Sequence, residues 1–230
     1  MSAYNVTLQD SWGRANVVNY IRSKKSQQTF RVIDVGASMN GWSHEVVDTI
    51  VDFTSGFYAS HVKQYKFDIT CNEQWEELEK EVEENGKYDF SICTHTLEDI
   101  IDPKLVVNKL SNISKAGYIA TPSKYIELRK NIEGSYRGFI HHRWFFTFRD
   151  GAYFAYPKLN FLEYKEHFEY EVPDACKKYV DLNFFWKDSI ELQIINNNFL
   201  GPSVNAVLGY YKELNNNDDC DFLIKTYGTN

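Results

Sequence analysis

The 230-residue sequence has few of the features that mark secreted or membrane-spanning proteins. No apolar run approaches the ~20 residues that a helix needs to cross a bilayer. The N-terminal segment Met1–Asp10 lacks the basic flank and apolar stretch of a signal peptide. The cysteines form no C-x-x-C pair and show no disulfide-framework spacing; they are Cys71, Cys93, Cys176 and Cys220. We therefore expect a cytoplasmic protein with reduced thiols and no membrane span.

Positive charge is also scarce. Lys and Arg number 25 against 32 Asp and Glu, which gives a formal net charge of -7 at pH 7. Nucleic-acid binding draws most of its affinity from clustered Lys and Arg on phosphates, so we do not expect a nucleic-acid partner. A small-molecule or carbohydrate ligand agrees better with this charge. A homodimer is compatible with the sequence, which leaves the oligomeric state open.

What the sequence does contain is an alternation of helix and strand patterns up to Pro122. A helical pattern over Asp10–Ser23 precedes a β-branched run over Phe30–Gly36, which ends on a glycine. Later strand patterns cover residues 49–53, 62–69, 88–94 and 116–121, and helices are predicted over residues 73–85 and from Asp102-Pro103 onward. Strands that alternate with helices predict an α/β, Rossmann-like fold with a mostly parallel, doubly wound sheet.

The pattern changes after Pro122. Apolar runs over Arg143–Phe148 and Ala152–Tyr156 flank Asp150-Gly151, and Asp-Gly between two such runs predicts a β-hairpin. We therefore expect an antiparallel hairpin in the C-terminal half. Two later segments remain: residues 191–195 are compatible with a returning sheet strand, and residues 215–219 with a surface turn or mobile segment.

The most informative segment is Val32–Gly41, where a strand pattern ends on a glycine. A glycine there lets the backbone approach a ligand, and parallel sheets bind nucleotides at the carboxyl ends of their strands. The spacing is not G-x-G-x-x-G. This departure disfavours a dinucleotide-dependent oxidoreductase, because a pyrophosphate needs closely spaced glycines in line with a helix N-terminus.

Acidic residues close the next two predicted strands. Asp52 closes the second, where a carboxylate can accept hydrogen bonds from both ribose hydroxyls. Asp68, followed by Ile69, closes the third, where a carboxylate can accept one from an adenine amino group. The alternative for each carboxylate is to cap a turn or helix. Their register with the glycine loop favours a nucleoside-binding role.

These segments, in this order, resemble the class I methyltransferases that use S-adenosylmethionine (SAM). The resemblance rests on Asp34-Val35-Gly36-Ala37, the two acids above, and the segment from Tyr88 to Pro103, within about residues 30–122. In the family a similar "hxLEHhxDP" segment follows the fourth strand, and here Asp99 stands where histidine is common. The resemblance implies SAM as cofactor, bound by Asp34, Gly36, Ala37, Ser38, Asp52, Asp68, Ile69, Thr94 and His95.

The sequence also departs from the family between Gly41 and Thr49, where there is little room for a full helix. We expect a short helix or irregular chain around Trp42–His44.

Methyl transfer to a hydroxyl requires alignment of the two reactants and a group that helps to remove the proton. His95 is the first candidate for this base, because it follows the fourth predicted strand and histidine titrates near neutral pH. Its alternative role is to cap or orient the loop. His141 and His142 are the second candidates. Adjacent residues on a strand point to opposite faces, so we expect at most one of these two to face the pocket.

Aromatic and arginine side chains accompany these histidines. We predict that Tyr136, Arg137, Arg143 and Trp144 bind the methyl acceptor, because aromatic faces and planar donors suit sugar rings and flat metabolites. A purely structural role is the alternative. Glu98, Asp99, His141 and His142 could also supply ligands for a divalent cation, but we do not predict a bound metal.

The function that we predict is SAM-dependent O-methylation of a small-molecule or carbohydrate hydroxyl. N-methylation of a small amine or protein side chain, and a non-catalytic module of the same fold, remain as alternatives. We expect one domain over residues 1–230, in which an N-terminal helix within 1–28 precedes a cofactor-binding half at 29–122 and an acceptor-side half at 123–230.

Overall fold

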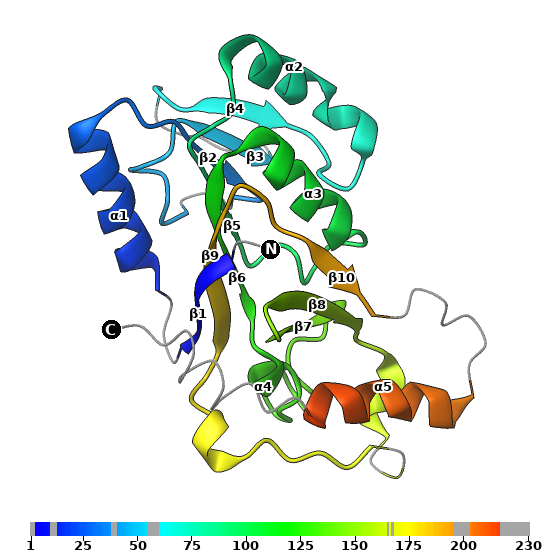
Figure 1. The fold of residues 1–230 in the computed structure, drawn as a ribbon. Helices are drawn as coiled ribbons and strands as arrows, with labels where there is room; N and C mark the ends of the chain where they lie inside the picture. The colour runs from blue at the N-terminus through cyan, green and yellow to red at the C-terminus, as the bar shows by residue number, and fades with distance from the viewer. Residues whose placement is uncertain are drawn as a thin grey trace.

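The computed structural model describes residues 3–9, 13–37, 41–54, 60–164, 166, 168–195 and 203–216. Within these residues the chain forms a seven-stranded main sheet and a separate three-stranded sheet (Figure 1). The elements are β1 (Ala3–Gln9), α1 (Arg14–Gln27), β2 (Val32–Val35), β3 (Thr49–Asp52), β4 (Lys63–Lys66), η1 (Asn72–Trp75), α2 (Glu76–Asn85), β5 (Phe90–Thr94), α3 (Pro103–Ile113), β6 (Ala116–Pro122), α4 (Lys124–Glu127), β7 (Trp144–Arg149), β8 (Ala152–Pro157), η2 (Asn160–Glu163), η3 (Asp174–Cys176), β9 (Asp181–Lys187), β10 (Leu192–Ile194) and α5 (Val204–Asn216). None of the helices in these described ranges is long and apolar enough to cross a bilayer.

The main sheet has the strand order β1-β9-β6-β5-β2-β3-β4. Strands β2 to β6 run parallel to one another, and β9 runs antiparallel to both β6 and β1. Read from β4 inward, the parallel strands follow the 3-2-1-4-5 order of doubly wound folds, in which the order reverses between β2 and β5. The α/β, Rossmann-like fold predicted from the sequence is confirmed.

Helices cover both faces of this sheet (Figure 1). Side chains of the central strands alternate between the faces, so that Val32 packs in one cluster with Val17 of α1. Ile33, on the other face, packs in a second cluster with Leu78 of α2 and Val107 of α3. Because both faces are buried, the central strands consist mainly of apolar residues.

The predicted start of α3 at Asp102-Pro103 is also confirmed. The Asp102 side chain accepts a hydrogen bond from Leu105 N, with Oδ1 and N 2.9 Å apart. Pro103 begins the helix, where its missing N–H leaves no hydrogen bond unmade. This cap fixes the point at which the loop after β5 ends and α3 begins.

The three-stranded sheet has the order β10-β8-β7 and contains the predicted antiparallel hairpin. Asp150 and Gly151 both have positive φ, 50° and 77°, as the tight turn of a two-residue hairpin loop requires. Residues 191–195 do supply a strand, β10, but it pairs parallel with β8 of this smaller sheet. The antiparallel strand of the main sheet is instead β9, to which the sequence pattern assigned no element.

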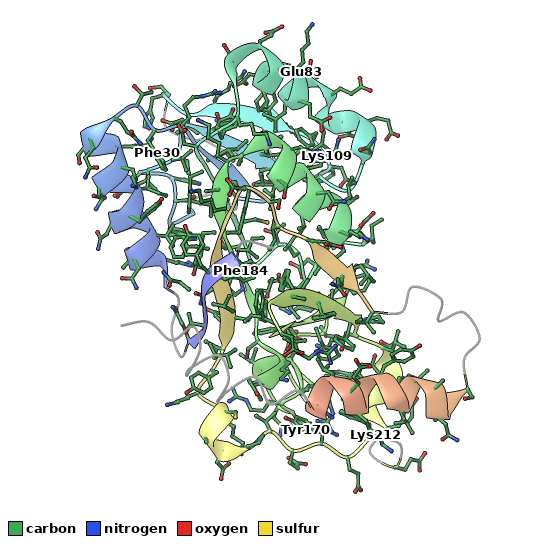
Figure 2. The ribbon with its side chains drawn as sticks, viewed as in Figure 1. Phe30, Glu83, Lys109, Tyr170, Phe184 and Lys212 are labelled. Carbon is green, nitrogen blue, oxygen red and sulfur yellow. The ribbon has the colours of Figure 1, made fainter. Side chains whose placement is uncertain are left out.

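Phe184 of β9 lies where the main sheet meets the three-stranded sheet (Figure 2). Its ring centroid lies 4.9 Å from that of Tyr153 and 5.6 Å from that of Phe148. Its side chain is completely buried. This aromatic contact therefore holds the smaller sheet against the main sheet.

We expect Phe184→Ala to lower the free energy of unfolding by about 3 to 5 kcal/mol, because it opens a cavity between two packed layers. Urea denaturation of the purified variant measures this change. The matched control is Ile101→Ala, whose side chain is 63% exposed, and for which we expect a change within about 0.5 kcal/mol. Equal effects of the two substitutions would contradict the assignment of Phe184 to the junction.

Candidate functional site

A cavity of about 560 Å³ opens at the carboxyl ends of β2, β3, β4 and β5, and we call it the strand-end cavity. Its lining residues come from the loops that follow these strands. They are Gly36, Ala37, Asp52, Phe53, Thr54, Phe67, Asp68, Ile69, His95, Thr96, Asp99 and Ile100. Most of the residues predicted to bind the cofactor are thus brought together. Asp34 and Thr94 do not line this cavity, and Ser38 lies outside the described residues.

Gly36 is a position at which two of these loops are in direct contact. Its φ is +79°, and a Cβ atom placed there would lie 2.4 Å from both Cγ2 and Oγ1 of Thr96. The Thr96 hydroxyl donates a hydrogen bond to the Gly36 carbonyl oxygen, 3.2 Å away. Only glycine therefore fits, and the strand order reverses at this same place, between β2 and β5.

The two strand-end carboxylates both cap turns and line the cavity. Asp52 Oδ1 accepts hydrogen bonds from the backbone N and hydroxyl of Thr54, at 2.9 and 3.1 Å. Asp68 Oδ1 accepts two hydrogen bonds in the same way, from the backbone N and the hydroxyl of Thr70, each at 2.8 Å. The capping role weighed for these residues in the sequence is present, and it orients each carboxylate at the cavity wall.

Asp34 lies beneath the strand-end cavity, within β2. It is buried and accepts a hydrogen bond from the hydroxyl of Ser43. Burial disfavours its charge and raises the pKa of Asp34 to about 7, although the hydrogen bond from Ser43 lowers it in part. Ser43 belongs to a turn at residues 42–46, so the irregular chain expected in place of a helix is confirmed.

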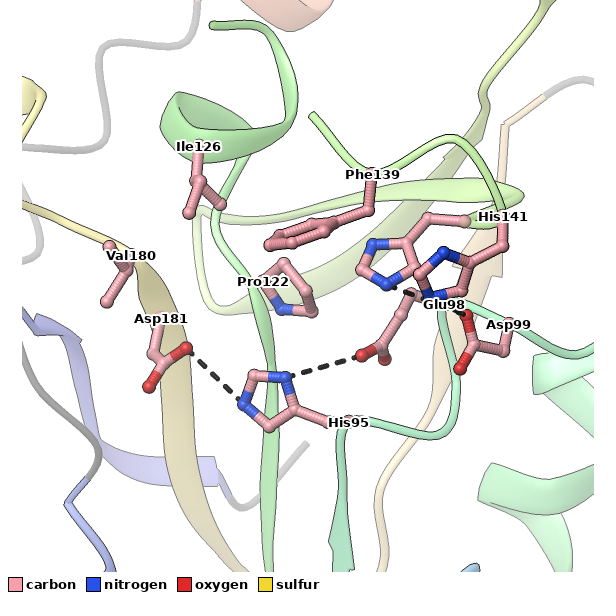
Figure 3. A pocket seen from close by; sticks show the side chains of 10 residues that line it. His95, Glu98, Asp99, Pro122, Ile126, Phe139, His141, Val180 and Asp181 are labelled. Atoms are coloured by element: carbon pink, nitrogen blue, oxygen red, sulfur yellow. Dashed lines mark ion pairs between the residues drawn. The ribbon is translucent and has the colours of Figure 1, made fainter. Parts of the chain in front are cut away.

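A second cavity of about 410 Å³ adjoins the first, and we call it the histidine cavity (Figure 3). Its lining residues come from the loop after β5, the ends of β6 and β9, α4, and the turn before β7. They are His95, Glu98, Asp99, Pro122, Ile126, Phe139, His141, His142, Val180 and Asp181. His95 and Asp99 line both cavities. The two cavities therefore share a wall.

His95 lies between two buried carboxylates (Figure 3). Its Nδ1 is 3.4 Å from Glu98 Oε1, and its Nε2 is 3.4 Å from Asp181 Oδ1. Burial alone would lower the pKa of His95, but its interactions with Asp181 and Glu98 outweigh burial and raise the pKa. The residue has a φ of 50°, a left-handed conformation seldom adopted outside glycine, which aims its ring into the shared wall.

Glu98 is the most deeply buried acid of the histidine cavity, with a residue exposure of 1%. Burial raises its pKa, and the interaction with His95 lowers it only in part. Its Oε2 atom has no hydrogen-bond partner among the described residues. A buried acceptor without a partner costs free energy, so this atom is suited to receive a proton or hydrogen bond from a ligand.

The placement of His141 and His142 corrects one expectation. Both line the histidine cavity, whereas we expected at most one to do so. The reason is that they lie in the turn before β7 and not on a strand, and their ring centroids are 4.4 Å apart. Burial would lower the pKa of His142, but a hydrogen bond to the Glu127 carboxylate outweighs it and raises the pKa.

The four residues predicted to bind the acceptor lie outside the histidine cavity. Tyr136 and Arg137 line a third cavity of about 490 Å³. The Arg137 side chain is buried and donates hydrogen bonds to backbone carbonyls, among them that of Leu128 at 2.7 Å. Arg143 Nε donates to Asp99 O at 3.0 Å, and Trp144 Nε1 donates to the Ile100 carbonyl at 2.8 Å. These two hold together the loops that carry the site.

Two acids of the site were not singled out in the sequence as site residues. Asp181 begins β9, a strand that the pattern did not predict, and it is only 2% exposed. Glu127, in the short helix α4, is fully buried and contacts His142 and Lys158. A carboxylate within the mainly apolar run that begins β9 was the available signal for Asp181, whereas the segment around Glu127 carries none.

The strand order and the cavity at the strand ends define a Rossmann-like, doubly wound α/β protein with a ligand-sized cavity at the point where the strand order reverses. No family model and no curated protein matches the sequence. Among solved structures, a magnesium protoporphyrin IX methyltransferase from Synechocystis PCC 6803 with bound SAH is 11% identical, with a TM-score of 0.40 over 76% of this chain and 82% of that chain.

Two further solved structures show similarity of the same order. The N-terminal domain of EvdMO1, solved in the presence of SAH and D-fucose, is 9% identical, with a TM-score of 0.35 over 74% of this chain and 82% of that chain. A protein from Thermoplasma acidophilum is 14% identical, with a TM-score of 0.38 over 81% of this chain and 89% of that chain. At these identities and TM-scores, the similarities assign no substrate and no residue role to this chain.

The raised pKa of Asp34 makes the stability of the protein depend on pH. Because the pKa is about 7 in the folded protein against an ordinary value of 3.8, the folded state keeps a proton that the unfolded chain releases between these values. This stabilisation is full below the ordinary value and is lost as pH rises through about 7. We expect Asp34→Asn, which keeps an acceptor for Ser43, to lose this dependence.

Chemical denaturation across this pH range measures the effect. The free energy of unfolding should fall more steeply with rising pH in the wild type than in Asp34→Asn. Asp188→Asn, at an exposed carboxylate, serves as control and should keep the wild-type slope. If the free energy of unfolding changed with pH at the same slope in the wild type and in Asp34→Asn, Asp34 would not be the source of the pH dependence.

Proposed function

We propose that this protein is a SAM-dependent methyltransferase that methylates a hydroxyl oxygen of a small-molecule or carbohydrate acceptor. The observation that carries the proposal is the shared wall of the two cavities, formed by His95 and Asp99. A cofactor in the strand-end cavity would lie directly beside an acceptor in the histidine cavity. Such proximity is the main requirement of an in-line methyl transfer.

The strand-end cavity agrees with SAM in size and chemistry. Its volume of about 560 Å³ lies within the range of small-molecule sites, roughly 300 to 1,000 Å³. The Gly36 backbone carries no side chain that would keep a ligand at a distance, so a ligand can approach it closely. Asp52 and Asp68 are suited to the ribose hydroxyls and adenine amino group of SAM.

When bound, SAM supplies an electrophilic methyl group, whose carbon bonds to the acceptor oxygen as the carbon–sulfur bond breaks and its electron pair stays on sulfur. The chain must then take up the hydroxyl proton. His95 and Glu98 both line the histidine cavity, and their facing atoms are 3.4 Å apart, so the pair can hold this proton. His95 is the base that we propose, with Glu98 as its partner.

The histidine cavity also matches a hydroxylated acceptor. Glu98, Asp99 and Asp181 offer carboxylates that accept hydrogen bonds from hydroxyls, and Phe139 offers an apolar face of the kind that packs on a sugar ring. The same carboxylates favour a second candidate, N-methylation of a small amine, because they would attract a cationic acceptor. A panel of sugars and small amines, assayed for S-adenosylhomocysteine release, separates the two reactions.

Binding of the product tests the cofactor assignment. We expect S-adenosylhomocysteine to raise the melting temperature while NAD does not, because a ligand stabilises only the state that it binds. Asp52→Ala should weaken this binding by about 1 to 3 kcal/mol, as calorimetry would measure. The control Asp174→Ala, at an exposed carboxylate, should bind normally. Stabilisation by NAD alone would refute the assignment.

Turnover tests the base. His95→Ala should lower the rate by about 100-fold or more, since general-base catalysis is typically worth 10²- to 10⁴-fold, with S-adenosylhomocysteine affinity near that of the wild type. Because the base acts when deprotonated and its pKa is raised, the wild-type rate should increase with pH through a value above 6.5. The variant should lose this increase. A variant with unchanged rate and pH profile would exclude His95.

A further inference from the structure

Three metal-binding side chains converge on the wall between the two cavities. Asp99, His141 and His142 each offer a ligand atom, and these atoms all lie within 4.8 Å of one another. Nε2 of His141 is 3.7 Å from Asp99 Oδ1 (Figure 3). Nε2 of His142 is 3.6 Å from the same oxygen. Both imidazoles therefore present the same nitrogen to one carboxylate.

The remaining ring nitrogens face other carboxylates. His142 Nδ1 is 2.7 Å from Glu127 Oε1, and Glu127 is fully buried, with its second oxygen 2.6 Å from Lys158 Nζ. His141 Nδ1 lies 3.8 Å from Glu133 Oε2. For His142, whose Nδ1 is within hydrogen-bond distance of Glu127, this is the arrangement that orients metal-binding histidines, because it fixes the tautomer that leaves Nε2 without a proton. His141 has a carboxylate on the same side, but at a distance too long for a hydrogen bond.

The two segments that carry the ligands are also fixed to each other. Arg143 N donates a hydrogen bond to the Glu98 carbonyl at 2.7 Å, and Arg143 Nε donates to the Asp99 carbonyl at 3.0 Å. Trp144 Nε1 donates to the Ile100 carbonyl at 2.8 Å. The backbone beside Asp99 is thus held against the backbone that follows His142, so the three side chains meet without a large rearrangement.

We propose that Asp99, His141 and His142 bind a divalent first-row transition-metal ion. Two imidazoles and one carboxylate suit such an ion and leave coordination positions open, whereas Mg²⁺ and Ca²⁺ prefer oxygen ligands. An ion about 2.1 Å from each ligand separates neighbouring ligand atoms by roughly 3.0 to 3.4 Å. The two Asp99-to-histidine distances are already close to this separation. The residue pattern alone did not lead us to expect a metal.

The position of this site indicates a role for the ion in binding the acceptor, and this role rests on the proposed function. Asp99 lines both cavities, and both histidines line the histidine cavity. An acceptor hydroxyl that binds the ion would therefore be held at the wall facing the cofactor. A bound ion would lower the pKa of the coordinated hydroxyl, and His95 and Glu98, which line the same cavity, would take up its proton. The ion thus selects acceptors with an oxygen that can coordinate it.

The test is metal binding by the full chain, without an affinity tag, after treatment with a chelator. We expect about one Co²⁺ per chain, detected by calorimetry and by the visible absorption of the bound ion, with Mn²⁺ and Zn²⁺ competing and Mg²⁺ much weaker. His141→Ala and Asp99→Asn should each weaken Co²⁺ binding by at least about 100-fold. Their side chains are 57% and 42% exposed, so we expect both variants to fold.

The matched control is His61→Ala, which removes an exposed histidine outside both cavities and should bind Co²⁺ like the wild type. Absence of Co²⁺ binding by the wild type, or equal binding by all three variants, would overturn the proposal. S-adenosylhomocysteine binding by the metal-free protein is measured in parallel. If the protein binds Co²⁺ but not S-adenosylhomocysteine, the proposed function is refuted. If it binds S-adenosylhomocysteine but not Co²⁺, the metal site is refuted.

Discussion

The loop after β5, residues 95–101, is held on two sides, and both cavities take part of their walls from it. On one side Thr96 contacts the backbone of Gly36, where no larger residue fits. On the other side Arg143 and Trp144 donate hydrogen bonds to the carbonyls of the loop. The cap at Asp102 fixes its end. Because the contacts with Gly36 and with Arg143 and Trp144 come from two distant parts of the chain, the loop has one conformation only when the whole fold is complete.

The parts of the fold that the sequence predicted are those decided by local patterns. The β-branched run ending at Gly36, the proline after Asp102 and the Asp150-Gly151 turn each carry their structural reason within a few residues. Strands β1 and β9 were not predicted, and their place in the sheet depends on the pairing of β9 with both β1 and β6, which lie far away in the sequence. Each of the two strands has seven residues, and apolar and polar residues alternate over Tyr4–Gln9, a strand pattern to which no element was assigned.

The candidate site likewise contains parts that local sequence patterns predict and parts that depend on long-range contacts. The strand-end residues Gly36, Asp52 and Asp68 could be placed together because the carboxyl ends of parallel strands share one edge of a sheet. The meeting of Asp99 with His141 was considered from the sequence as a possible set of cation ligands but not predicted, since it depends on how a turn folds back across the sheet. Asp181 reaches His95 only through β9. Sequence patterns therefore predicted the strand-end cavity better than the histidine cavity.

Buried carboxylates are concentrated at this site. Asp34, Glu98, Glu127 and Asp181 are each no more than 4% exposed, and each has a hydroxyl, histidine or lysine beside it. Burial of a charge is costly unless it is paired, and a pair of this kind seldom adds net stability. The arrangement is better understood as one that serves binding and proton transfer at the expense of stability.

The pairing of β1 with β9 also has a consequence for folding during synthesis. β1 leaves the ribosome among the first described residues, but its partner is made only after the parallel strands, the smaller sheet's hairpin and α4. Until then the apolar side chains of β1 have no strand to pair with, and contacts of such long sequence separation form slowly. Of the seven strands of the main sheet, the one synthesised first is therefore among the last to be incorporated.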